Sequence, residues 1–143
     1  MVKVKKNIHI DAPLDKVFDF ITTPENLPEI WPSMIKAGNV KPSPIGGNDF
    51  DWEYKMAGVP LRGHSKMIEF VPYEHVVNIN ESGIPATMIW DYRDENGGMR
   101  LDLVVEYEVP TPVLGKLAEK VVRKINENEL EVMLANLKAA TEM

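Results

Sequence analysis

The side chains best suited to acid–base chemistry in this sequence are Tyr54, Tyr92, Tyr107 and Glu69. Each tyrosine is flanked by charged residues at both neighbouring positions, so we expect its side chain on the inner face of a strand. A phenol can donate a hydrogen bond to a carbonyl or enolate oxygen. A carboxylate whose pKa is raised by burial can act as a general base near neutral pH. The direction of Glu69 stays open, because both faces of its segment mix polar and apolar residues.

Other arrangements that resemble catalytic or metal sites have simpler interpretations. His64 and Ser65 are adjacent, and neighbours on a strand point to opposite faces, so they cannot pair directly. The three histidines share no metal-ligand spacing, and the acidic residues of segment 49–53 fit a solvated strand face. No nucleotide-binding loop, nucleophile elbow or zinc-protease motif is present. We therefore expect no metal and no cofactor.

Composition indicates one globular domain, which we expect to span residues 1–143. A chain of this length buries enough surface to fold without cross-links, and it has no cysteine, which suits a reducing cytoplasm. A net charge of −6 argues against nucleic-acid binding, since phosphate contacts need a basic face. No apolar run resembles a signal peptide or reaches the length of a membrane span. We expect a cytoplasmic protein.

The order of elements follows from periodicity. Residues 2–10 alternate between apolar and polar and predict a strand, and 13–22 and the residues just after it predict two short helices. From about 34 to 110 the alternation continues, broken by five turn signals, which predicts six strands joined by five hairpins. Apolar residues at helical spacing then predict one long C-terminal helix, capped by Thr111 and beginning at Pro112.

These elements suggest a space between sheet and helix. Seven strands at about 4.8 Å spacing make a sheet roughly 30 Å wide, whereas a helix is about 10–12 Å across. The sheet must therefore curl around the helix, and the space between them is either filled by side chains or left as a pocket. The side chains expected to face it, and to bind a ligand if it is open, are Trp52, Tyr54, Met56, Met88, Trp90, Tyr92, Leu101, Leu103, Val105 and Tyr107 on the sheet and Leu117 and Val121 on the helix.

The segment IHIDAPLDKVFDFITTPENLPEIWPSM, residues 8–34, resembles the start of the polyketide cyclase/dehydrase and lipid-transport-like family of the START-like (SRPBCC) superfamily. Two later stretches extend the resemblance over nearly the whole chain: IEFVP at 68–72, and LANLK at 134–138 followed by Glu142. The order of these motifs, rather than any one of them, carries the resemblance.

The resemblance implies an α+β helix-grip (START/Bet v 1-like) fold: a seven-stranded curved antiparallel sheet wrapped around a long C-terminal helix, with two short helices between the first two strands. It also implies a cavity for a small hydrophobic ligand of the lipid, sterol, polyketide or quinone class, and leaves transient membrane contact open. Two alternatives remain: a polyketide cyclase/dehydratase-type enzyme, and a protein-interaction module like the Hsp90-activator branch. The sequence does not reveal the oligomeric state.

Overall fold

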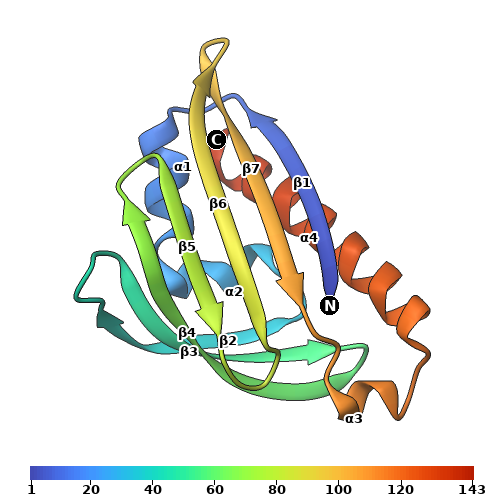
Figure 1. Cartoon of the computed structure of the whole chain (residues 1–143). Helices are drawn as coiled ribbons and strands as arrows, with labels where there is room; N and C mark the ends of the chain where they lie inside the picture. The colour runs from blue at the N-terminus through green and yellow to red at the C-terminus, as the bar shows by residue number, and fades with distance from the viewer.

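The structure is a computed structural model that describes residues 1–143, and its centre is a curved antiparallel sheet (Figure 1). Its seven strands are β1 (Val2–Ile10), β2 (Met34–Pro42), β3 (Asn48–Met56), β4 (Val59–Val71), β5 (His75–Asn80), β6 (Ala86–Glu95) and β7 (Gly98–Tyr107). From β2 to β7 each strand pairs with the next along the chain. The predicted series of six strands and five hairpins is therefore confirmed.

Strand β1 joins the sheet beside the last strand instead of the second. It pairs antiparallel with β7, from Val2 opposite Tyr107 to Ile10 opposite Met99. The strand order is thus β1-β7-β6-β5-β4-β3-β2, which leaves β1 and β2 as the two edges. The chain between these edges must cross from one side of the sheet to the other.

Short helices make that crossing. They are α1 (Leu14–Ile21), the 3-10 helix η1 (Pro24–Asn26) and α2 (Leu27–Ile30). The helical spacing of Val17, Phe18 and Ile21 turns these three side chains into the core. The prediction of short helices between the first two strands is confirmed.

The prediction of one unbroken C-terminal helix is wrong. The chain forms a single turn, α3 (Thr111–Leu114), and then the long helix α4 (Glu119–Thr141). Ala118 is extended, with ψ of 142°, so it stands outside the helix as its N-cap. Pro110, and not Thr111, is the N-cap of α3. Because the helix is interrupted, the apolar residues just before α4 are not in line with the face of α4 that is buried.

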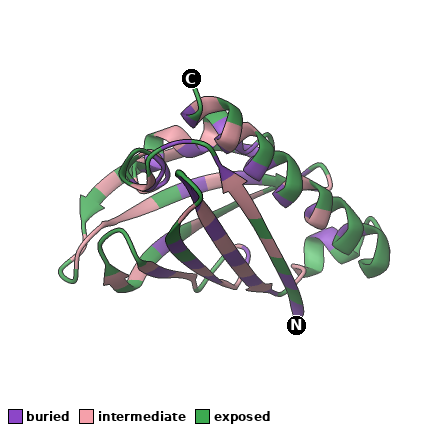
Figure 2. Ribbon diagram, turned by 90° about the horizontal axis from the view of Figure 1, so that it is seen from above, coloured by how far each residue is buried: buried purple, intermediate pink, exposed green.

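Helices α1, α2 and α4 all lie on one face of the sheet (Figures 1 and 2). Figure 2 shows the strands as bands of buried and more exposed residues, which is the alternation expected when one sheet face is covered. A connected core of 31 buried residues lies between the two layers. From α4 it receives Val122, Leu130, Met133, Leu134 and Leu137. None of the helices combines the length and the apolar character needed to cross a membrane.

Candidate functional site

Side chains do not completely fill the space between the sheet and the helices, and a cavity of about 130 Å³ remains there. Its lining is formed by 25 residues, of which 18 are hydrophobic, so its walls are mainly apolar. The lining comes from the α1–α2 region, the sheet and α4, and it includes Thr22, Trp31, Phe50, Trp52, Tyr54, Met56, Ser65, Met67, Val76, Asn78, Asn80, Met88, Trp90, Tyr92, Val105, Tyr107, Asn126 and Leu130. Seven of the lining residues are only half-buried: Thr22, Asn48, Phe50, Met67, Asn78, Asn80 and Ala86.

Eight of the twelve side chains predicted to face a ligand line this cavity: Trp52, Tyr54, Met56, Met88, Trp90, Tyr92, Val105 and Tyr107. Trp52 has this position because two glycines leave room for its ring. A Cβ atom at Gly63 or at Gly83 would collide with the indole. The position of the Trp52 ring in the cavity wall therefore depends on glycine at both of these positions.

The other four predicted ligand-facing residues lie elsewhere. Leu101 and Leu103 of β7 are completely buried in the core but do not reach the cavity. Leu117 lies in the break before α4 and Val121 in the first turn of α4, and both are exposed at the surface. Their placement in the ligand site is corrected, because it assumed one continuous helix.

Glu69, a candidate base, is also outside the cavity. The pairing of β4 with β5 shifts its register between Met67 and Glu69, which is the effect of an extra residue in one strand. Glu69 consequently turns to the exposed face, where its carboxylate bonds His75 Nε2 at 2.7 Å. Phe70 turns inward instead and packs against Phe18, with ring centroids 5.9 Å apart.

Polar side chains that the sequence prediction missed complete the lining. Asn78 accepts a hydrogen bond from Trp90 Nε1 at 2.9 Å and donates one to Ser65 Oγ at 3.0 Å. Asn80 accepts a weaker one from Trp52 Nε1 at 3.2 Å. The sequence of β5 could have predicted this, because every second residue of a strand points to the same face. Asn78 and Asn80 therefore share the face of the buried Val76. These bonds hold the two tryptophan rings in the cavity wall.

The three tyrosine hydroxyls differ in what they contact. Tyr107 accepts a hydrogen bond of 2.9 Å from Asn126 of α4, a residue that helical periodicity had not singled out. Tyr92 is buried and its hydroxyl has no partner. Its ring is held edge-on by Phe18, with centroids 5.0 Å apart. Tyr92 thus lines the cavity and carries a hydroxyl with unused hydrogen-bonding capacity.

Trp31 presents a second unpartnered group, its indole N–H, and packs edge-on against Tyr54 with ring centroids 6.0 Å apart. Burial raises the pKa of Tyr54 and the Glu129 carboxylate adds to the rise, while Trp31 and Ser33 act in the opposite direction. Burial dominates and raises the pKa of Tyr54, Tyr92 and Tyr107 above the usual range. All three phenols are therefore neutral at physiological pH.

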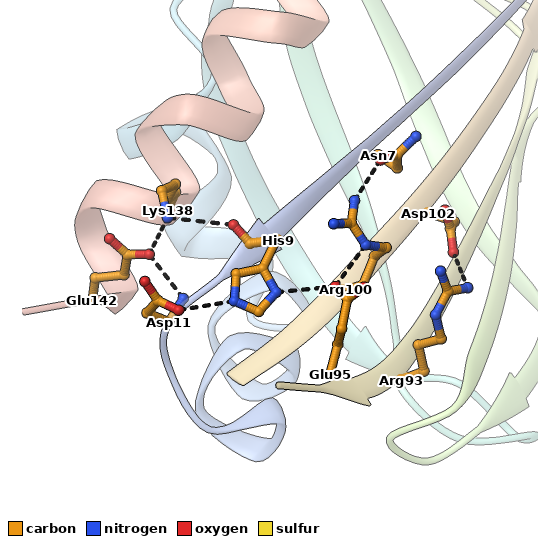
Figure 3. Close-up of polar contacts among 9 residues, drawn as sticks. All are labelled: Asn7, His9, Asp11, Arg93, Glu95, Arg100, Asp102, Lys138 and Glu142. Carbon is orange, nitrogen blue, oxygen red and sulfur yellow. Dashed lines mark hydrogen bonds and ion pairs between the residues drawn. The ribbon is translucent and has the colours of Figure 1, made fainter. Parts of the chain in front are cut away.

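No acidic or basic side chain and no histidine lines the cavity. The histidines lie on the outer surface in three separate places. His64 bonds Asp51, His75 bonds Glu69 and Asp91, and His9 bonds Asp11 and Glu95. Figure 3 shows the last group, in which Arg100 also reaches Glu95 and Lys138 of α4 reaches the His9 carbonyl. These histidines do not converge on a common point, and the charged groups bind one another outside the cavity.

A curved sheet closed over a C-terminal helix, with a mainly apolar cavity between them, defines a hydrophobic-ligand-binding domain of the START-like class. The chain belongs to the polyketide cyclase/dehydrase and lipid transport family, whose model matches residues 1–142. The predicted family and fold are confirmed. A search among curated proteins finds no match.

Solved structures show how widely this fold is shared. The protein TTHA0849 from Thermus thermophilus is 21% identical, with a TM-score of 0.80 over 96% of this chain and 95% of its own. A START superfamily protein from Mycobacterium smegmatis is 13% identical, with a TM-score of 0.82 over 98% and 97%. The di-domain aromatase/cyclase StfQ of the steffimycin biosynthetic pathway is 16% identical, with a TM-score of 0.75 over 99% of this chain and 50% of its own. At these identities the likeness concerns the fold.

Proposed function

We propose that the cavity binds an uncharged hydrophobic molecule whose hydrogen-bond acceptor meets the Tyr92 hydroxyl. The observation that carries this proposal is the pairing of an uncharged lining with a buried, unpartnered Tyr92 hydroxyl. A carboxylate or ammonium group in such a cavity would lose its hydration without finding a counter-ion, which is strongly unfavourable. A carbonyl, ether or hydroxyl oxygen loses less and gains the tyrosine as a donor.

The size of the cavity narrows the ligand class. Its volume of about 130 Å³ is below the range of about 300–1,000 Å³ typical of drug-sized ligand pockets. It is close to that of apolar cavities that hold a single aromatic ring. Among the lipid, sterol, polyketide and quinone classes, this volume favours a compact ring compound, or a longer molecule of which only one ring enters the cavity.

The cyclase interpretation has less support from this geometry. Proton transfer from carbon needs a base within hydrogen-bond reach of the substrate. The candidate base Glu69 faces outward, and the lining offers only neutral phenols, amides and hydroxyls. The tyrosines can orient and polarise an oxygen, which suits binding.

The test compares three compounds that share the bicyclic tetralin ring system: tetralin, 1-tetralone and 1,2,3,4-tetrahydro-2-naphthoate. We expect 1-tetralone to bind, measured by chemical-shift changes in NMR titration, and the anion to bind at least about tenfold more weakly because its charge would be desolvated. Substitution Tyr92→Phe should weaken 1-tetralone binding about fivefold, the usual contribution of one hydrogen bond, and leave tetralin binding unchanged or improved.

Tyr107→Phe is the matched control, because the hydroxyl it removes already has a partner in Asn126. The proposal is overturned if the anion binds as well as the ketone, or if Tyr107→Phe and not Tyr92→Phe removes the preference for the ketone. Shifts confined to residues outside the cavity would also contradict it.

A further inference from the structure

The segment from Thr111 to Ile125, here called the α3–α4 segment, is unusually exposed for its apolar content. Only Val113 and Val122 within it are buried. The segment extends beyond the edge of the sheet in both views (Figures 1 and 2). Four large apolar side chains in it face solvent, with exposed fractions of 44, 37, 47 and 39% for Leu114, Leu117, Val121 and Ile125 respectively.

The same segment concentrates positive charge. It contains four basic residues and a single acidic one, whereas the whole chain has 16 basic and 22 acidic residues. Its basic residues are Lys116, Lys120, Arg123 and Lys124, and none of them forms an ion pair within the protein. On α4, Lys120 and Lys124 repeat at the same four-residue interval as Val121 and Ile125, so a row of cations runs beside the apolar row.

We propose that the α3–α4 segment docks on the surface of a bilayer that contains anionic phospholipids. An apolar row flanked by lysines is the pattern of helices that lie in the membrane interface, with the apolar side chains among the acyl chains and the cations at the phosphates. Attraction to anionic headgroups accounts for cations that have no partner within the protein. Docking also removes from water apolar side chains that nothing else in the chain covers.

A second copy of the chain fits this surface less well. An isologous contact through the segment brings together two copies of the same surface. With four basic residues and one acidic residue, each copy carries a net charge of +3, so the two surfaces repel each other. The bilayer instead supplies opposite charge.

The location of the segment connects docking with the cavity. Asn126 directly follows the segment, lines the cavity and bonds Tyr107, and Leu130 lines the cavity one turn later. A bilayer that holds Val121 and Ile125 therefore lies next to the part of α4 that closes the ligand site. In this arrangement, a hydrophobic ligand passes between the cavity and the adjacent bilayer, in either direction.

The test measures co-sedimentation of the full chain with vesicles of phosphatidylcholine alone and of equimolar phosphatidylcholine and phosphatidylglycerol. We expect partition into the anionic vesicles to be about tenfold or more stronger, and to weaken as salt is added. Two double substitutions, Leu117→Glu with Val121→Glu and Lys120→Glu with Lys124→Glu, should each reduce this partition about tenfold or more.

Two matched controls use exposed residues outside the segment. Val132→Glu places a charge on the exposed side of the same helix, and Lys5→Glu reverses an exposed cation on β1. Both should leave vesicle binding within about twofold of the wild type if the segment alone makes the contact. Circular dichroism melts show whether each variant is folded.

Three outcomes overturn the proposal: no binding to anionic vesicles, equal binding to both vesicle types, or equal losses in the control variants. A fourth is self-association in sedimentation velocity that Val121→Glu abolishes, which would make the segment an interface between copies. The measurement needs no cavity ligand, so it fails or succeeds independently of the proposed ligand specificity.

Discussion

Two tyrosines on neighbouring strands show how one hydrogen bond distinguishes a structural residue from a candidate binding residue. Tyr107 of β7 uses its hydroxyl to accept from Asn126, which ties the sheet to α4. Tyr92 of β6 is equally buried and its hydroxyl has no partner. A buried donor without a partner costs about 1–3 kcal/mol of stability. The unliganded protein therefore keeps an unfavourable group in its interior, and in the proposed function a ligand oxygen becomes its partner.

This contrast predicts opposite effects from the same substitution. Tyr92→Phe should raise the free energy of unfolding by about 1 kcal/mol, because it removes an unpartnered group without creating a large void. Tyr107→Phe should lower it by about 1 kcal/mol or more, because Asn126 then loses its partner inside the core. Urea denaturation of the two variants checks both signs. Equal losses of stability would mean that the Tyr92 hydroxyl has a partner after all.

At the level of residues, strand alternation was a good guide wherever the strand was regular. It placed the tyrosines and tryptophans of β3, β6 and β7 on the inner face, and the structure brings them to the cavity. It left Glu69 undecided, because both faces of its segment mix polar and apolar residues. In the structure a register shift after Met67 turns Glu69 outward. The three asparagines of the lining escaped notice because their polar side chains are satisfied by partners distant in the sequence. That these residues contact a ligand stays a prediction.

At the level of elements, the largest difference from expectation is the start of α4. Apolar residues from Leu114 to Leu137 fit a helical spacing, and this predicted one continuous helix. The chain instead leaves the helix at Gly115 and re-enters it after Ala118, so the residues before Val122 are out of phase with the buried face. Periodicity identifies which residues are apolar, but a short interruption changes the direction in which they point.

The break predicts that a better N-cap will stabilise α4. Ala118 is in the extended conformation of an N-cap but has no side chain to accept from the free amides of the first turn. Ala118→Asp should raise the free energy of unfolding by about 1 kcal/mol, through the capping bond and the helix dipole.

The control is Ala135→Asp, at an exposed position inside α4, which should lower stability by about 0.5 kcal/mol because aspartate is a poorer helix former than alanine. Urea denaturation measures both variants. A loss of stability from Ala118→Asp like that from Ala135→Asp would mean that the helix runs through residue 118.

At the level of the whole molecule, two histidines hold separate strands together from outside. The hydrogen bond to Glu95, with help from Asp11, raises the pKa of His9 above its usual value, and Asp91 followed by Glu69 does the same for His75. Because both folded-state pKa values are raised, the charged forms stabilise the fold. That contribution is complete below the ordinary histidine pKa of 6.5 and is lost as pH rises through the raised values.

We therefore expect the protein to be more stable at about pH 6 than at about pH 8, measured by urea denaturation at low salt. His9→Gln combined with His75→Gln should reduce this difference, and added salt should reduce it in the wild type, because both groups are near the surface. Below about pH 4 the sign reverses, since the pKa values of Glu95 and Glu142 are lowered by their partners. A stability that does not change across the neutral range would show that neither histidine gains its charge on folding.

The pairing of β1 with β7 also determines when the ligand site can form as the chain is made. The five hairpins from β2 to β7 involve neighbours in sequence and can close as soon as they leave the ribosome. Strand β1 emerges first but has no partner until β7 has been synthesised, and Asn126 and Leu130 of the cavity lining follow later still. Strand β1 therefore stays unpaired until β7 has been made, and during that time it must not pair with any other strand. The cavity is complete only when α4, which follows every strand in the sequence, has packed against the sheet.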